Sequence, residues 1–347
     1  MTYALEVEWE GGLTAVYQVA DNSHTEPEFT GSADLFALIP RSNGEWLIYV
    51  EASSTASFDG VSAFYPTVNG DARSVLTNDG KGGIQISEFN YTFIPDDKRR
   101  FTLGLVDPSA WLDRGRIAND ENKHFLNGSF VNNATIEFPD YTIGAIFRWL
   151  AKDSRPEFTV VITGSDGIAD LPDRSYQSLL DVTSDSRGAF IGAGASWILD
   201  RASWRLGAWV KTNDHPVAGS VDETEMNYGV YGVYGWQSGS NALNFRAGLA
   251  NPDVSISDRF IAVAYERKSK YGLLGIGVAK THITDGYQVS DKSSAVDSEF
   301  FFRIPILQNT GHITPSVQYV VNPGFDISGE LNSSSAVVAG VRFHLSF

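Results

Sequence analysis

The carboxy-terminal segment 337–347, VVAGVRFHLSF, alternates between two kinds of residue. Apolar side chains occupy every odd position: Val337, Ala339, Val341, Phe343, Leu345 and Phe347. The even positions include Gly340, Arg342, His344 and Ser346. Period-two alternation places the two kinds of side chain on opposite faces of a β-strand, and ~9–11 tilted residues cross the hydrocarbon of a membrane. The segment therefore predicts a strand with one face toward lipid and one toward a polar interior, as in a transmembrane β-barrel.

Similar segments recur along the chain, separated by turn-forming residues, and they predict about sixteen strands. The expected strands are 7–20, 30–40, 45–54, 82–94, 100–106, 141–150, 157–165, 188–199, 203–212, 226–236, 241–250, 259–268, 271–283, 298–307, 312–322 and 335–347. The linkers between them alternate between short and long. Transmembrane barrels have short periplasmic turns at one rim and long extracellular loops at the other. We therefore predict an all-β fold, a single closed antiparallel transmembrane barrel that forms one domain over residues 1–347.

The residue composition is compatible with other β-folds as well. The chain has 33 Gly, 21 Phe, 14 Tyr and 8 Trp among 347 residues, which would also suit a soluble sandwich or a propeller. Neither class sorts its loops by length, and no repeat recurs at a period of roughly 20–50 residues. No apolar run reaches the ~20 residues of a transmembrane helix. Because the first basic residue is Arg41, we expect a mature chain from which the signal peptide is absent.

The charge balance is strongly acidic, with 42 acidic against 26 basic residues and a net charge of −16. An acidic protein is a poor partner for nucleic acid, because phosphate binding needs a basic surface. In a barrel, the excess acid is expected on outer loops, where it serves solubility or meets divalent cations between lipopolysaccharide heads. We expect no cofactor and no resident metal. A weak external Ca²⁺ site in the acidic loop of Asp166, Asp170 and Asp173 is an alternative to plain solvation.

Basic residues inside the expected strands indicate which face points inward. A Lys or Arg that faces lipid at mid-membrane costs ~2–4 kcal/mol, so these side chains should face the lumen. The bases assigned to the lumen are Arg148, Arg205, Arg246, Arg267, Arg303 and Arg342. The same argument places Glu51, Glu88 and Glu299 inside. The two charge signs could neutralise each other in a plugged lumen, or they could line a water-filled pore.

The longest linker, 107–140, is the third long loop and combines polar groups with apolar anchors. Its polar and charged residues include Asp107, Asp113, Arg114, Arg116, Asn119, Asp120, Glu121, Lys123 and His124, and its anchors are Trp111, Phe125, Leu126 and Phe130. A freely solvated loop does not need such anchors, so we expect the loop to fold into the barrel and narrow it. Trp111 and Phe125 are candidate stacking platforms for sugars or hydrophobic anchors of the loop. His124 either contacts solute or forms a hydrogen bond within the loop.

Part of this loop resembles a known family. The stretch Gly104–Asn133 resembles the carbohydrate-selective porins of the OprB type at Asp113, at 119–121 (NDE), at 125–127 (FLN) and at 131–133 (VNN). The segment 315–324 (PSVQYVVNPG) is similar to the penultimate strand of that family, and 336–347 is similar to its last strand. A final strand that ends on Phe347 also resembles the insertion signal of bacterial outer-membrane proteins.

The resemblance implies a sixteen-stranded channel in the bacterial outer membrane through which sugars or other small polar solutes diffuse passively. It also implies an arginine-rich wall that faces acids on the inward loop. The expected partners are these solutes, outer-membrane lipid and lipopolysaccharide. The oligomeric state stays open between monomer and trimer.

Two other functions remain as alternatives. One is a plugged barrel that acts as an adhesin or as a partner in an envelope complex. The other is a barrel lipase or protease that uses Ser and His on its wall. The chain has neither an HExxH nor a GxSxG motif, and none of its six His residues pairs with another at helical spacing. We therefore do not expect an enzyme.

Overall fold

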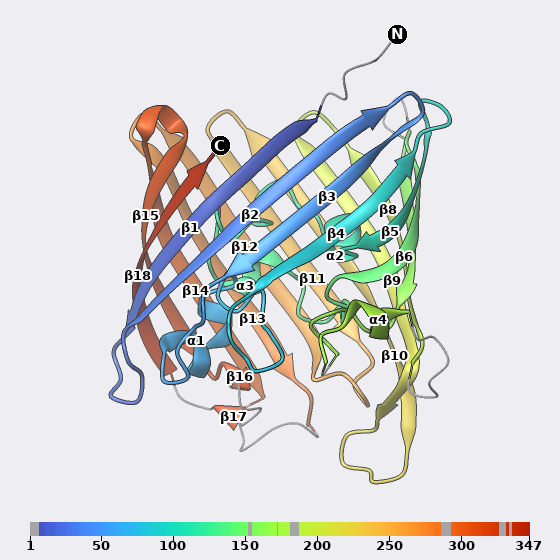
Figure 1. Cartoon of the computed structure of the whole chain (residues 1–347). Coiled ribbons are helices and arrows are strands. Elements are labelled where there is room, and N and C mark those ends of the chain that lie inside the picture. The colour runs from blue at the N-terminus through green and yellow to red at the C-terminus, as the bar shows by residue number, and fades with distance from the viewer. Residues whose placement is uncertain are drawn as a thin grey trace.

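The computed structural model describes residues 7–151, 155–171, 173–180, 187–285, 293–325, 331–332 and 335–347. Sixteen strands form one closed barrel in which every neighbouring pair is antiparallel (Figure 1). The first strand pairs with the last, so the sheet has no free edge and every strand has two neighbours. Such closure satisfies the backbone groups that lipid cannot. The predicted fold class and strand number are confirmed.

The barrel strands lie close to the predicted segments. They are β1 (Glu8–Ala20), β2 (Glu28–Arg41), β3 (Gly44–Ser53), β4 (Ile84–Phe93), β5 (Arg99–Val106), β6 (Thr142–Trp149), β7 (Glu157–Gly164), β8 (Ala189–Ile198), β9 (Ala202–Pro216), β10 (Thr224–Ser238), β11 (Asn241–Ala250), β12 (Ser257–Ser269), β13 (Gly272–Ile283), β14 (Ser294–Ile306), β15 (Gly311–Val321) and β18 (Ser335–Ser346). Both described ends of the chain lie at the rim that carries the short turns (Figure 1).

The loops contain short elements that the sequence pattern did not reveal. They are α1 (Val61–Phe64), η1 (Pro66–Val68), α2 (Ser109–Leu112), α3 (Gly128–Val131), α4 (Tyr176–Leu179), η3 (Leu307–Asn309) and a small sheet of β16 (Gly324–Phe325) and β17 (Leu331–Asn332). None of the helices in the described ranges has the length and apolar character needed to cross a membrane.

Strands β9 and β10 extend further than predicted, because they continue pairing beyond the apolar part of the wall. His215 pairs with Glu225 and Pro216 with Thr224, in a segment that was expected to be a loop. The residues 212–215 are all polar, so the alternation of apolar and polar residues no longer marks the strand there. Backbone pairing carries the hairpin past the point where the sequence pattern ends.

The two faces of the wall alternate as the last strand predicted. On β18, Val337, Val341 and Phe343 are exposed on the outer face, whereas Val338 and Arg342 are buried on the inner face. Val341 also pairs with Tyr17 of β1, which is exposed on the same side. Parity along a strand therefore separates two environments throughout the closed sheet.

Arg267 is an exception to the predicted inward set. It lies on the same face of β12 as Ile261 and Val263, which point outward, and it is exposed. Its neighbour Glu266 is buried and faces inward instead. Arg267 lies near the end of β12 at Ser269, where the cost of an outward charge falls because a long side chain can reach interfacial water. The assignment of Arg267 to the lumen was wrong because it applied the mid-membrane cost at a rim.

Candidate functional site: the lumen and its inward loop

The loop 107–140 leaves β5, returns at β6 and packs on the inner side of the barrel wall. In Figure 1 its helices α2 and α3 lie within the outline of the barrel. Phe125 and Phe130 of the loop are buried, and their ring centroids are 4.7 Å apart. Phe125 also meets Phe301 of β14 edge-on, at 5.0 Å. The neighbouring strand β13 leaves room for these rings at Gly277, where an added Cβ would lie 2.6 Å from the Phe130 ring.

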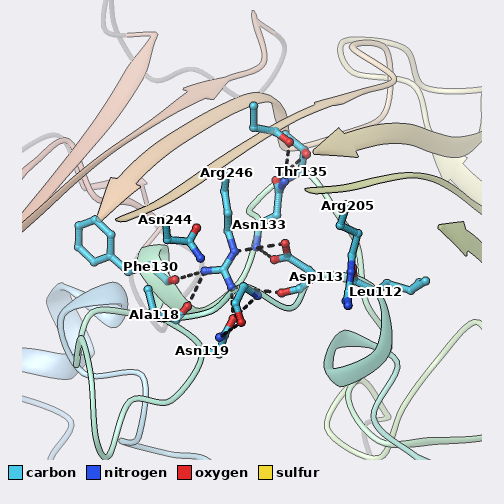
Figure 2. Close-up of polar contacts among 12 residues, drawn as sticks. Leu112, Asp113, Ala118, Asn119, Phe130, Asn133, Thr135, Arg205, Asn244 and Arg246 are labelled. Atoms are coloured by element: carbon cyan, nitrogen blue, oxygen red, sulfur yellow. Dashed lines mark hydrogen bonds and ion pairs between the residues drawn. The ribbon is translucent and has the colours of Figure 1, made fainter. Parts of the chain in front are cut away.

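Arg246 of β11 is the most heavily bonded contact between wall and loop (Figure 2). Its Nε lies 3.2 Å from Oδ1 of Asp113, and both side chains are buried. Its two terminal nitrogens donate to the carbonyl oxygens of Asp113, Ala118 and Phe130 and to Oδ1 of Asn119. The guanidinium thus satisfies carbonyls of three loop segments at once, which a planar fork of five donors can do.

Three further arginines hold the same loop through its backbone. Arg205 Nη1 donates to the carbonyls of Trp111 and Leu112, each at 3.1 Å. Arg303 donates to the carbonyl of Lys123. Arg342 donates to the carbonyls of Glu121 and His124, the latter at 2.7 Å. These guanidiniums face inward as predicted from strand parity, but what they contact is the loop.

Inward carboxylates anchor the loop from β12 and β14. Glu299 accepts hydrogen bonds from the backbone amides of Leu126 and Asn127, at 3.1 and 2.8 Å. Asp297 accepts from the Ser129 hydroxyl at 2.7 Å. Nδ1 of His124 lies 2.5 Å from Glu266 on β12. The two β14 acids bind the turn that opens α3, so arginine and carboxylate anchors together fix the loop from 111 to 130.

A cavity of about 810 Å³ lies between the loop and the inner wall formed by β1 to β4 and β18. Nine carboxylates line it: Glu10, Asp34, Glu51, Glu88, Asp107, Asp113, Asp120, Glu121 and Asp140. The lining Lys and Arg side chains are Arg114, Arg116 and Lys123. The cavity is therefore acidic, in contrast to the arginine-rich side that the loop covers.

The predicted site residues divide into two groups. Those that line this cavity are Glu51, Glu88, Asp107, Asp113, Arg114, Arg116, Asn119, Asp120, Glu121, Lys123 and His124. Trp111, Arg148, Arg205, Arg246, Arg303 and Arg342 are not among its lining residues in the described part of the chain. Trp111 packs against a buried apolar cluster, and the Arg148 guanidinium lies 5.6 Å from the centre of its ring. Arg116 turns away toward the β8–β9 turn, where it donates to the Leu199 carbonyl at 2.5 Å.

The acidic wall contains residues that the sequence reasoning missed. The Tyr49 hydroxyl donates to Asp34 at 2.7 Å, and the rings of Tyr49 and Phe36 are stacked with centroids 4.0 Å apart. All three side chains line the cavity. Asp34 and Phe36 have the same parity in β2 as the buried Ser32, so the parity argument used elsewhere would have found them. The pairing of β3 with β4 shifts register between Tyr49 and Val50 of β3, so Ser87 and Glu88 of β4 are both buried on the inner side.

Two other expectations concern loop acids and wall histidines. Asp166, Asp170 and Asp173 make separate local hydrogen bonds, and the described residues contain no group of three potential metal ligands. The Ca²⁺ site therefore stays a prediction. His344 lies 3.0 Å from the Ser346 hydroxyl and 2.9 Å from that of Thr14, and none of its hydrogen bonds within the described ranges reaches a carboxylate. This geometry gives no support to a Ser–His–acid arrangement at that site.

Comparison with known proteins places this architecture among bacterial outer-membrane channels. No family model matches the chain, and no curated protein matches it in sequence. The high-pH structure of OprB from Pseudomonas putida is 13% identical, with a TM-score of 0.77, over 98% of this chain and 94% of that one. The low-pH structure of the same protein has a TM-score of 0.57 at 10% identity, over 98% and 92% of the two chains.

A second solved channel, DcaP from Acinetobacter baumannii, is similar along its whole length. It is 13% identical, with a TM-score of 0.62, over 100% of this chain and 99% of that one. At such identities the likeness concerns the fold. The resemblance that the residues 104–133 suggested is thus confirmed at that level: the chain has the fold of OprB and of related outer-membrane channels.

Proposed function

We propose that this protein is a passive channel of the bacterial outer membrane for small polar solutes, with carbohydrates as the first candidates. The observation that carries the proposal is the polar cavity of about 810 Å³ left between the docked loop 107–140 and the opposite wall. A loop that merely filled the barrel would have no need of a charged, accessible inner wall. The fold shared with solved outer-membrane channels supports the location and the class of function.

The chemistry of the cavity wall suits sugars. The stacked pair of Phe36 and Tyr49 offers an aromatic surface to the apolar face of a sugar ring. Carboxylates such as Glu51 and Glu88 accept hydrogen bonds from hydroxyl groups. In this proposal the stacking role expected of Trp111 belongs to Tyr49, because Trp111 packs within the apolar support of the loop. Such contacts are individually weak, as conduction requires.

Reconstitution tests the proposal directly. Liposomes that contain the protein should swell in iso-osmotic solutions of mono- and disaccharides, and larger oligosaccharides should be excluded. Replacement of Tyr49 by Leu should weaken the block of ion current by sugars, whereas replacement of the outward Trp204 by Leu should not. Absence of swelling with all sugars, together with absence of ion current, would favour the plugged structural barrel.

A barrel hydrolase remains the less supported alternative. Its test is a screen of the detergent-solubilised protein against phospholipid and peptide substrates. Turnover that disappears on replacement of His344 by Ala would overturn the assignment as a channel without catalytic activity.

A further inference from the structure

A groove of about 710 Å³ crosses the outer face of the barrel from β9 to the start of β14. Its apolar lining includes Leu206, Val230, Leu249 and Ile261, and all four side chains are exposed on the outward face. The groove faces away from the lumen, so the proposed channel function does not use it. In a membrane, this part of the outer wall would be in contact with lipid.

The strand register explains why the wall is hollowed here. One lateral row of paired residues runs Leu206, Gly232, Ala247, Ile261 and Lys280. Large side chains stand at Leu206 and Ile261, and the two positions between them are small. Gly232 places no side chain in this row, and an added Cβ would lie 3.2 Å from Leu206 Cδ2, so the Leu206 side chain borders the outward space at this position. The depression is thus built into the sequence of four adjacent strands.

The end of the groove nearest the long loops is cationic. Arg259, Lys280 and His282 line it there, close to the ends of β12 and β13 that join the long loops. Arg259 Nε lies 3.2 Å from Asp258, and its Nη2 lies 2.9 Å from His282. Nδ1 of His282 lies 2.5 Å from the same carboxylate. Lys280 is exposed and makes no hydrogen bond or ion pair with any residue that the structure describes.

Two features of this groove therefore match an anionic amphiphile. The apolar row would contact an acyl chain, and the cationic end would contact an acidic head at the height of the membrane surface. Asp258 balances one of the positive charges, and Lys280 has no counterion among the residues that the structure describes, on a surface that faces lipid. A phosphate can accept hydrogen bonds from Lys280 and from the exposed guanidinium of Arg259 together.

We propose that this groove binds lipopolysaccharide, with one acyl chain along the row from Leu206 to Ile261 and a phosphate between Arg259 and Lys280. Lipopolysaccharide is favoured over phospholipid because the cationic end lies at the long-loop rim, which faces the outer leaflet in such barrels. This choice rests on the proposed outer-membrane location. In the occupied groove, one lipopolysaccharide molecule would stay bound to the outer wall of β9 to β13.

Native mass spectrometry of the purified, delipidated protein with added lipopolysaccharide tests the site. We expect the wild type to bind the lipid. The variant Arg259→Gln/Lys280→Gln should bind it with an affinity at least about tenfold lower, since each charged contact is worth about that much. Arg267→Gln is the matched control, because Arg267 is also exposed on the outward face of β12 but at the short-turn end. Gly232→Leu fills the groove and should weaken binding without any change of charge.

The outcomes separate the occupants. Equal lipid binding by the double variant and the control, or binding of phosphatidylglycerol as tight as that of lipopolysaccharide, would overturn the proposal. A lipid-free dimer or trimer that the Gly232→Leu variant disrupts would show that the groove is instead an interface between copies of this chain. Because all these substitutions face outward, single-channel conductance should stay unchanged. Failure of the lipid site is therefore distinguishable from failure of the channel function.

Discussion

At the scale of single residues, Arg246 shows how burial changes the role of a lumen charge. Strand parity places its guanidinium inside, but the loop then covers it completely, and its positive charge is balanced by Asp113. Its remaining donors satisfy backbone carbonyls that would otherwise be buried without partners. The residue therefore fixes the shape of the lumen and does not meet the solute.

Replacement of Arg246 by Gln should destabilise the protein strongly. It leaves the Asp113 carboxylate buried without its partner and several carbonyls without donors, a loss of about 3–5 kcal/mol. Denaturation in urea with the protein in detergent measures this loss. The double variant Arg246→Leu/Asp113→Leu should recover part of the stability, because it removes both charges together. An Arg246→Gln variant as stable as the wild type would show that the pair does not hold the loop.

At the scale of elements, the loop 107–140 is held on one side of the inner barrel wall by side-chain contacts. Its helices α2 and α3 are single turns, too short to be stable in isolation. Their stability must come from contacts with the wall: α3 packs in the cluster of Phe125, Phe130 and Phe301, and Leu112 of α2 packs in a second buried apolar cluster. Loosening one group of contacts should therefore free a whole segment.

Replacement of Phe125 by Ala tests this dependence. Truncation of a fully buried Phe should cost about 3–5 kcal/mol and should speed hydrogen exchange of the amides from 120 to 131. Leu103→Ala is the control, because Leu103 is exposed on the outer face of β5 and should leave exchange in the loop unaltered. Unchanged protection of the loop in the Phe125→Ala variant would contradict the assigned packing.

At the scale of the whole molecule, the loop divides the lumen into two electrostatic halves. The arginines of β9, β11, β14 and β18 lie under it, and carboxylates dominate the accessible side. An accessible pore lined by negative charge attracts cations and repels anions. The same acidic balance extends over the chain, whose net charge is −16.

The pore should accordingly prefer cations. Reversal potentials in a salt gradient should give a cation-to-anion permeability ratio above one, and the Glu51→Gln/Glu88→Gln variant should lower it. Asp200→Asn is the control, since Asp200 is exposed at the short β8–β9 turn. A preference for anions in the wild type would mean that the buried arginines, and not these carboxylates, set the field in the pore.

The selectivity should also depend on pH. Burial in the loop, with repulsion from Asp71 and Asp120, raises the pKa of Glu121 to about 8. Its carboxyl group is thus mostly neutral below that pH and becomes negative as the pH rises through it. The cation-to-anion ratio should therefore increase between about pH 7 and pH 9, and the increase should be smaller in Glu121→Gln. An equal increase in the variant would assign the titration to another group.

The sequence predicted the barrel well because successive side chains face lipid and the polar interior in turn, and this alternation repeats along every strand. The parity of Arg205, Arg246 and Arg342 followed from it, and Arg267 failed where the strand reaches the interface. The same pattern carries no information on what covers an inward side chain. Asp113 and Arg246 are separated by more than a hundred residues, and their pairing depends on the path of the loop. For that reason the sequence left Trp111 and Phe125 open between stacking platforms and anchors of the loop, and the structure packs both against buried apolar clusters.

The most direct test of the account is single-channel conductance in planar bilayers, for the wild type and for a variant in which 114–124 is replaced by a short Gly–Ser linker. We expect discrete conductance steps for the wild type and larger steps for the variant, because the loop occupies the lumen. Absence of steps in both proteins, or equal conductance of the two, would contradict the claim that this barrel is a channel narrowed by its third long loop.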